Sequence, residues 1–144
     1  MIFLDTNVIS ESLRKAPSPT VMSWLAAHDD SIAIPTVTLA EIAFGIAKIW
    51  PDQRSQLLQR GLDSWRGRFA GRIFAFTEQA AMAYGELMGA AQRAGRPLSV
   101  PDGMIAAITL VNQGRLATRN GRDFGAVPVP LIDPWNGATH SRGL

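Results

Sequence analysis

The chain opens with Met1-Ile2-Phe3-Leu4-Asp5-Thr6-Asn7, and this stretch decides the fold prediction. An apolar strand begins at Ile2 and ends at Asp5, and a helical pattern of apolar residues follows at once. A strand so short and so apolar is typical of a strand buried on both faces of a parallel sheet. Asp5 is therefore expected at the carboxyl end of that strand, the edge at which open α/β sheets place their chemistry.

The rest of the chain repeats this alternation of short apolar strands and amphipathic helices. Further strands are expected over 31–34, 72–76, 116–118 and 129–132. Helices are expected over 8–14, 18–28, 38–49, a stretch ending near 65, 77–95 and 99–114. Strands alternating with helices indicate an α/β fold, a compact α/β/α sandwich with a short, mainly parallel central sheet. We expect one domain over 1–135, followed by a short polar C-terminal tail over 136–144.

The composition narrows the class of protein. With 144 residues, 47% of them hydrophobic, the chain has enough apolar material for one globular core. No apolar run reaches the roughly 18 residues of a membrane span, and no secretory signal is evident at the N-terminus, so a cytoplasmic protein without membrane contact is expected. Cysteine is absent and histidine occurs only twice. Any metal must therefore be held mainly by oxygen, which favours Mg²⁺ or Mn²⁺ over zinc.

Four acidic residues stand at the ends of strands or at the starts of helices: Asp5, Glu41, Asp102 and Asp123. Gathered at one edge of the sheet, such carboxylates repel each other by about 1 to 4 kcal/mol per pair at 4 Å. A bound divalent cation removes that conflict, and two bridged cations would suit in-line displacement at phosphorus. The polar neighbours Asn7, Thr118 and Asn120 are expected to orient a carboxylate or a water molecule.

Each of these acids also has a purely structural interpretation. Asp5 is placed to cap the first helix, and Thr38-x-x-Glu41 matches a capping box. Ser99-x-x-Asp102 resembles the same device, and the fourth acid lies in a glycine-containing loop where a solvated carboxylate is common. The sequence leaves both interpretations open for every acid taken alone.

The basic residues are almost all arginine, with only Lys15 and Lys48 among the 14 cationic residues. Arginine matches the geometry of phosphate groups, so this bias favours a nucleic-acid ligand. A genome rich in arginine codons would produce the same bias. Arg119 and Arg122 lie within a few residues of Asp123, and we expect them to contact the phosphate backbone of such a nucleic acid.

Four segments together resemble the PIN-domain ribonucleases, specifically the VapC/FitB-like toxins of bacterial type II toxin–antitoxin systems. The segments are Phe3-Leu4-Asp5-Thr6-Asn7-Val8-Ile9-Ser10-Glu11, Thr38-Leu39-Ala40-Glu41-Ile42-Ala43-Phe44-Gly45-Ile46, Pro101-Asp102-Gly103-Met104-Ile105-Ala106-Ala107 and Leu116-Ala117-Thr118-Arg119-Asn120-Gly121-Arg122-Asp123-Phe124. Each string is short, but all four in this order are specific, and they span nearly the whole chain. One departure is Gly103, where relatives usually carry a small residue with a side chain.

The resemblance implies a toxin that hydrolyses phosphodiester bonds of single-stranded RNA with metal-activated water. It implies Mg²⁺ as the cofactor, with Mn²⁺ able to substitute. Its catalytic and metal-binding residues carry over to Asp5, Glu41, Asp102 and Asp123, with Thr118 or Asn120 as a supporting group. It also implies a homodimer and a small cognate antitoxin protein, joined in a heterotetramer or a larger complex.

The residues disfavour two other classes of protein and leave one alternative function open. A phosphatase of the haloacid-dehalogenase type requires a second aspartate two residues after the first, where this chain has Asn7. A receiver domain requires a late lysine, and none follows Lys48. The remaining alternative is a catalytically silent PIN-like module that binds RNA or protein.

Overall fold

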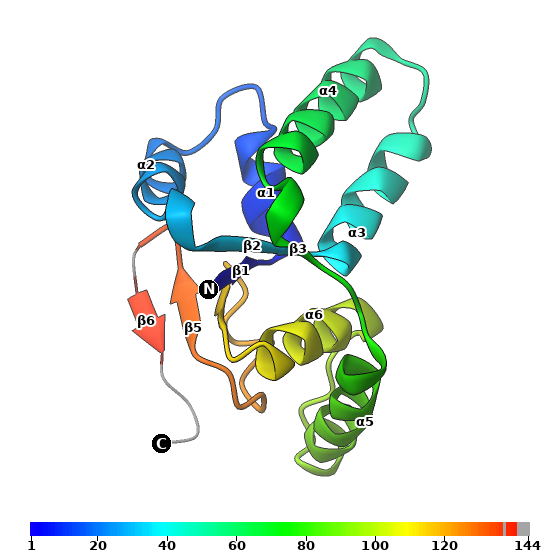
Figure 1. The fold of residues 1–144 in the computed structure, drawn as a ribbon, viewed down its shortest axis with the longest axis vertical. Helices are drawn as coiled ribbons and strands as arrows, with labels where there is room; N and C mark the ends of the chain where they lie inside the picture. Colours follow the sequence, from blue (N-terminus) through cyan, green and yellow to red (C-terminus); the bar gives the residue numbers. More distant parts are fainter. Residues whose placement is uncertain (137, 141–144) are drawn as a thin grey trace.

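The computed structural model describes residues 1–136 and 138–140 (Figure 1). The strands are β1 (Ile2–Leu4), β2 (Ile32–Pro35), β3 (Ile73–Phe74), β4 (Arg115–Ala117), β5 (Leu131–Asp133) and β6 (Ala138–His140). The α-helices are α1 (Thr6–Ser12), α2 (Pro19–Ala27), α3 (Thr36–Ala47), α4 (Gln53–Arg68), α5 (Glu78–Arg93) and α6 (Val100–Val111). Within these described residues, no helix is both long and apolar enough to cross a membrane.

The strands form one sheet in the order β3-β2-β1-β4-β5-β6. The first five are parallel, and β6 pairs antiparallel with β5 at the edge. From β1 the chain proceeds outward to β2 and β3, and it then returns to place β4 on the other side of β1. The strand order therefore reverses between β1 and β4, and crevices for ligands form at such switch points.

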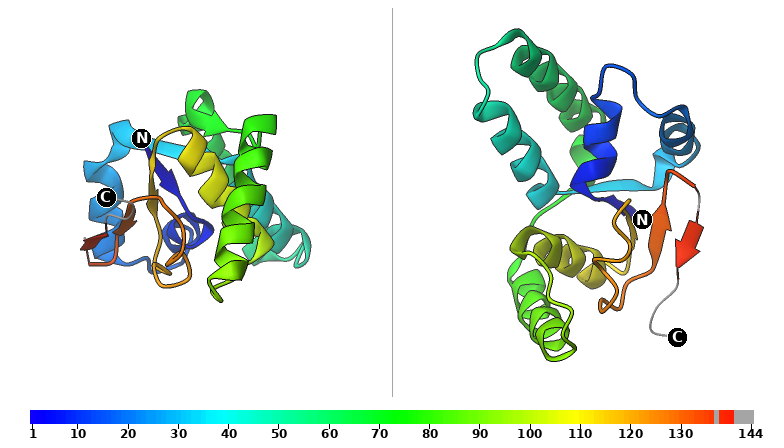
Figure 2. Two further views of the ribbon diagram at one scale, coloured as in Figure 1. Left: turned by 90° about the horizontal axis from the view of Figure 1, so that it is seen from below. Right: turned by 180° about the vertical axis from the view of Figure 1, so that it is seen from behind.

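Helices cover both faces of the sheet, and alternate residues of strands β1 to β5 enter two separate cores. Ile2 and Leu4 of β1 pack with residues of α1 to α4, whereas Phe3 packs with residues of α5 and α6. The two groups of helices lie on opposite sides of the strands in Figures 1 and 2. Since successive side chains of a strand point to opposite faces, a strand buried on both faces is apolar throughout, as the sequence indicates. The predicted three-layer α/β fold is confirmed.

The helix that carries Glu41 begins earlier than predicted. The capping-box interpretation of Thr38-x-x-Glu41 is wrong, because α3 starts at Thr36 and the position before it is Pro35. Thr38 lies inside the helix, and its buried hydroxyl donates to the Leu4 carbonyl at 2.9 Å. By contrast, the hydroxyl groups of Ser18, Thr77 and Ser99 do cap helices, at the starts of α2, α5 and α6.

The C-terminal region contains more structure than a polar tail implies. β6 falls within 136–144 and pairs with β5 through the register Ile132–Thr139. Residues 137 and 141–144 of the expected tail lie outside the described residues. The domain boundary after residue 135 stays a prediction.

Close packing between α5 and α6 accounts for Gly103. A Cβ atom at this position would overlap the sulfur of Met88 and approach Cε2 of Tyr84 to 3.0 Å. Gly103 is buried in α6, so a side chain there would force both α5 residues to shift. The departure from the family pattern therefore reflects the local helix contact, and it leaves the four acids untouched.

Candidate active site

Asp5 lies at the switch point of the sheet, directly after β1. Its backbone N–H donates to the Ala117 carbonyl of β4 at 2.9 Å, and its carboxylate caps α1 by accepting the Thr6 N–H at 2.8 Å. The structural interpretation of Asp5 as a helix cap is thus confirmed. It does not exclude chemistry, because only one carboxylate oxygen serves the cap.

The second oxygen of Asp5 accepts hydrogen bonds from the neighbouring strand and helix. Thr118, which follows β4, donates its hydroxyl to Oδ2 of Asp5 at 2.7 Å, and Asn7 donates Nδ2 to the same oxygen at 3.3 Å. The Thr118 hydroxyl in turn accepts the Asn120 N–H at 3.0 Å, while Oδ1 of Asn7 accepts the Arg119 N–H at 3.3 Å. Of Thr118 and Asn120, only Thr118 contacts the Asp5 carboxylate, as Asn7 also does, whereas Asn120 reaches Thr118 through its backbone.

Glu41 and Asp102 approach Asp5 from two different helices. The Thr6 hydroxyl of α1 donates to Oε1 of Glu41 on α3, which ties Glu41 to the residue next to Asp5. Asp102 stands in the first turn of α6, where its backbone N–H donates to the Ser99 hydroxyl at 3.3 Å. The Asp102 side chain is not used by the cap and is half-buried.

The pKa values show that these carboxylates interact. Burial raises the pKa of Asp5 from 3.8 to about 6, with further increases from Asp102 and Glu41 and opposing hydrogen bonds from Thr118 and Thr6. Burial also raises the pKa of Asp102, assisted by the charges of Glu41 and Asp123. Carboxylates raise one another's pKa in this way only when their charges lie close together.

Asp123 occupies the outer side of this group. It lies in the exposed loop after β4, where its backbone N–H donates to the Asn120 carbonyl at 2.9 Å. Its charge acts on the pKa of Asp102 but does not figure among the influences on Asp5. The structure therefore brings Asp5, Glu41 and Asp102 together and places Asp123 beside Asp102.

The oxygen ligands available at this site suit a hard divalent cation, although they do not yet form a complete coordination site. All are carboxylate or hydroxyl oxygens, which Mg²⁺ and Mn²⁺ prefer. The mutual charge effects described above are those a divalent cation would relieve. Among the described residues, however, no three acidic or histidine side chains are already gathered in a geometry that coordinates one ion.

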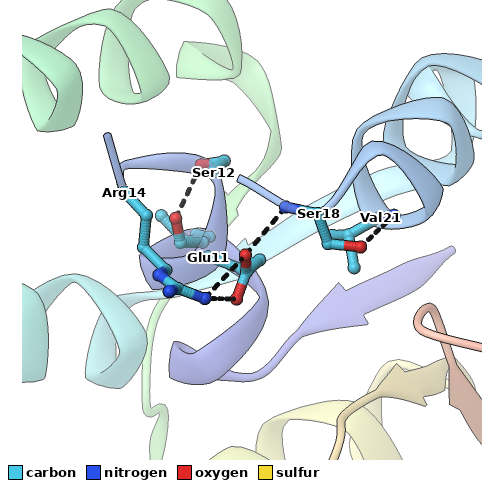
Figure 3. Close-up of polar contacts among 6 residues, drawn as sticks. Glu11, Ser12, Arg14, Ser18 and Val21 are labelled. Carbon is cyan, nitrogen blue, oxygen red and sulfur yellow. Dashed lines mark hydrogen bonds and ion pairs between the residues drawn. The ribbon is translucent and has the colours of Figure 1, made fainter. Parts of the chain in front are cut away.

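Glu11 is a further buried carboxylate, whose role the sequence does not reveal. Only 5% of Glu11 is exposed, and its Oε2 accepts the Ser18 N–H at 2.9 Å, which lowers its pKa together with the Arg14 guanidinium (Figure 3). Glu11 thus ties the end of α1 to the start of α2. Its spacing from Arg14 is readable as an i,i+3 pair, but its burial depends on the path of the following loop.

A hollow of about 500 Å³ adjoins the acidic group on the side of β5. Its walls include Thr118 and Asp123 together with the two arginines expected to contact RNA, Arg119 and Arg122. Arg119 also holds its guanidinium 4.9 Å from the centre of the Trp135 ring. Both arginines are exposed, as a ligand-binding role requires.

The sequence profile of the PIN domain matches residues 2–130. The chain belongs to the PIN domain family. Among its PIN-domain relatives, toxin FitB of Neisseria gonorrhoeae is 35% identical over 138 residues, which cover 94% of this chain and 99% of FitB. The VapC ribonuclease Y4jK of Sinorhizobium fredii is 34% identical over 140 residues, covering 96% of this chain and all of that protein.

Solved structures support the same assignment. The crystal structure of FitAcB from Neisseria gonorrhoeae superposes on this PIN domain with a TM-score of 0.86 and 35% identity, covering 94% of this chain and 99% of the other. A structure of FitAB bound to a DNA fragment gives the same TM-score at 34% identity, covering 94% and 96% of the two chains. The resemblance inferred from the four sequence segments is therefore confirmed at the level of family and fold.

Proposed function

We propose that this PIN-domain protein is the toxin of a toxin–antitoxin pair and that it hydrolyses phosphodiester bonds of single-stranded RNA. One observation carries the proposal: Asp5, Glu41 and Asp102 converge from the end of β1, from α3 and from α6 on the switch point of the sheet, where burial together with the charges of Asp102 and Glu41 raises the pKa of Asp5. The ribonuclease name of the relative from Sinorhizobium fredii and the toxin name of FitB support the same activity.

The proposed cofactor is Mg²⁺, for which Mn²⁺ would substitute. Asp5, Glu41 and Asp102 would hold it, with Asp123 completing a second or shared site. When bound, a divalent cation promotes the ionisation of water and offsets negative charge on the leaving oxygen. Hydrogen bonds within this chain position the acidic side chains. Thr118 and Thr6 bind the Asp5 carboxylate, and Thr6 also binds Glu41. Asn7 connects Asp5 to the Arg119 backbone.

The proposed protein partners of this chain are inferred from the complexes in which its relatives have been solved. FitB occurs in a complex with FitA, and the FitAB complex has been solved on DNA. We therefore propose a small cognate antitoxin, a homodimer of this chain, and a heterotetramer or larger complex between the two. A cytoplasmic location follows from such an assembly acting on cellular RNA.

Cleavage of labelled single-stranded RNA tests the proposal. We compare the wild-type protein with Asp5→Asn in Mg²⁺, in Mn²⁺ and in EDTA, with Asp63→Asn as a control because Asp63 is an acid on α4 paired with Arg66. Cutting by wild type and Asp63→Asn, only with metal and with 5′-phosphate ends, supports the nuclease. Metal binding without cutting of any RNA would favour the catalytically silent binding module, and cutting by Asp5→Asn at the wild-type rate would refute the site.

A further inference from the structure

The hollow beside the acidic group has a basic wall that the four acids do not explain. Three guanidinium groups line it, from Arg96, Arg119 and Arg122. None of these three arginines forms an ion pair within the described part of the chain. Its volume of about 500 Å³ lies within the range of about 300 to 1,000 Å³ that small-ligand sites occupy.

Two carboxylates also line the hollow, but both have other roles. Oδ1 of Asp133 accepts the Trp135 N–H at 2.8 Å. Asp123 belongs to the acidic group through its effect on Asp102. With three guanidinium groups against these two carboxylates, the hollow carries one excess positive charge, and it meets the acidic group at Thr118 and Asp123.

Arg96 is the member of this wall that the sequence does not single out. It lies in the connection between α5 and α6, 26 residues before Arg122, and its Nη2 donates to the Arg122 carbonyl at 3.2 Å. Its guanidinium lies against the backbone of Gly125, where a Cβ atom would overlap it. Gly125 is buried and Arg96 is exposed, so the absence of a side chain at 125 gives the guanidinium its place on the wall.

A chain of phosphodiesters fits this division of charge. The acidic group suits one phosphate only when a divalent cation is present, whereas fixed guanidinium groups attract a phosphate directly. We propose that the hollow is a subsite for the RNA phosphate next to the scissile one, and that Arg96 binds this phosphate from a position set by Gly125. This inference rests on the proposed nuclease function, and it adds a substrate-binding residue to it.

RNA binding measured without cleavage tests the subsite. In an Asp5→Asn background with EDTA, a fluorescent single-stranded RNA is titrated against the parent, Arg96→Gln, Gly125→Ala and Arg54→Gln at several salt concentrations. Arg54 on α4 does not line the hollow, so its variant controls for the loss of one positive charge. Gly125→Ala keeps the charge of Arg96 but displaces it.

We expect Arg96→Gln to weaken binding by about 10- to 150-fold, the range for losing one hydrogen bond to a charged group. The slope of log affinity against log salt should fall by about 0.7, the value for one lost contact to a single-stranded phosphate. Gly125→Ala should weaken binding by a similar factor with an unchanged melting temperature, and Arg54→Gln should change it by less than about twofold.

Three results would overturn the subsite. Equal effects of Arg96→Gln and Arg54→Gln would mean that only total charge matters. Wild-type affinity in Gly125→Ala, with weakened binding in Arg96→Gln, would mean that Arg96 acts without a fixed position. Unchanged RNA affinity in both, with weaker binding of an acidic peptide to Arg96→Gln than to the parent, would assign the hollow to a protein partner.

The cleavage assay on otherwise wild-type protein separates this inference from the proposed function. If the wild type cuts RNA and the Arg96 and Gly125 variants bind RNA like the parent, the nuclease stands and the subsite fails. If the wild type cuts no RNA but its RNA affinity depends on Arg96 and Gly125 as expected, the nuclease fails and the phosphate site stands alone.

Discussion

Replacing Asp5 by asparagine should stabilise the metal-free protein while abolishing its activity. Asp5 is 4% exposed, and its pKa in the folded protein is raised from 3.8 to about 6. A raised carboxyl pKa means that the folded state binds the proton more tightly than the unfolded state. The unfolding free energy of the wild type therefore falls as pH rises from about 4 to about 6 and is level above that.

The magnitude follows from the size of this shift. Moving a pKa from 3.8 to about 6 corresponds to about 3 kcal/mol of unfolding free energy lost at neutral and higher pH. Asparagine carries no charge at any pH, and it can still accept the Thr6 N–H that caps α1. It gives up one acceptor facing Thr118 and Asn7, at a cost of about 0.5 to 1.5 kcal/mol. We therefore expect a net gain of about 1 to 3 kcal/mol at about pH 8.

Urea unfolding followed by circular dichroism, in EDTA, measures this difference at about pH 8 and about pH 4. The gain should largely vanish at the lower pH, because the Asp5 carboxyl is then protonated in the folded state and, with a pKa of about 3.8, only partly ionised in the unfolded state. Asp63→Asn, at a half-exposed site on α4, should change stability by less than about 0.5 kcal/mol at either pH. A gain of equal size at both pH values, or a loss at pH 8, would refute the account of Asp5 as a charge made unfavourable by burial and by its acidic neighbours.

Added Mg²⁺ completes the test. An ion that binds only the folded state raises stability by about 4 kcal/mol at about 1,000 times its dissociation constant, which exceeds the difference expected between the two proteins. The wild type should gain this amount and Asp5→Asn should gain little, so saturating metal should reverse the order of the two proteins. A gain from metal that is the same in both would place the cation elsewhere.

Three further predictions follow from named contacts. Thr118→Val removes the hydroxyl that donates to Asp5 at 2.7 Å, so the pKa of Asp5 should rise above its wild-type value and cleavage should slow. An NMR titration of the Asp5 carboxyl carbon measures this pKa, and an unchanged value would contradict the assigned hydrogen bond. Glu11→Gln weakens the hydrogen bond that joins α1 to Ser18. Because the pKa of Glu11 is lowered, the variant should be less stable than the wild type at neutral pH, and this difference should shrink as the solution is acidified through that pKa. A constant difference in melting temperature across this range would argue against a hydrogen bond to a charged Glu11. Gly103→Ala should lower the free energy of unfolding by about 1 to 3 kcal/mol, because the new methyl group crowds Met88 and Tyr84. Adding Met88→Ala should recover part of that loss, and strictly additive losses in the double mutant would show that the two positions do not contact.

Local patterns along the chain were enough to predict the mainly parallel three-layer fold and the starts of α2, α5 and α6. The reason is that a strand buried on both faces must be apolar throughout, and a capping hydroxyl must stand next to the helix that it caps. The same logic placed Asp5 at the carboxyl end of β1. It failed at α3, where Thr38 matched a capping pattern but lies inside the helix and bonds to Leu4 of a different strand.

The alternation of elements, the family and the residue types at the strand ends can all be predicted from the sequence. How these residues meet depends on three-dimensional packing: Thr118 rather than Asn120 bonds to the Asp5 carboxylate, Asp123 lies outermost, and Glu11 is buried. The position of Arg96 on the wall of the hollow is likewise set by the tertiary structure. These relations depend on distances between segments far apart along the chain, and such distances are set by how helices pack on the sheet rather than by any local pattern.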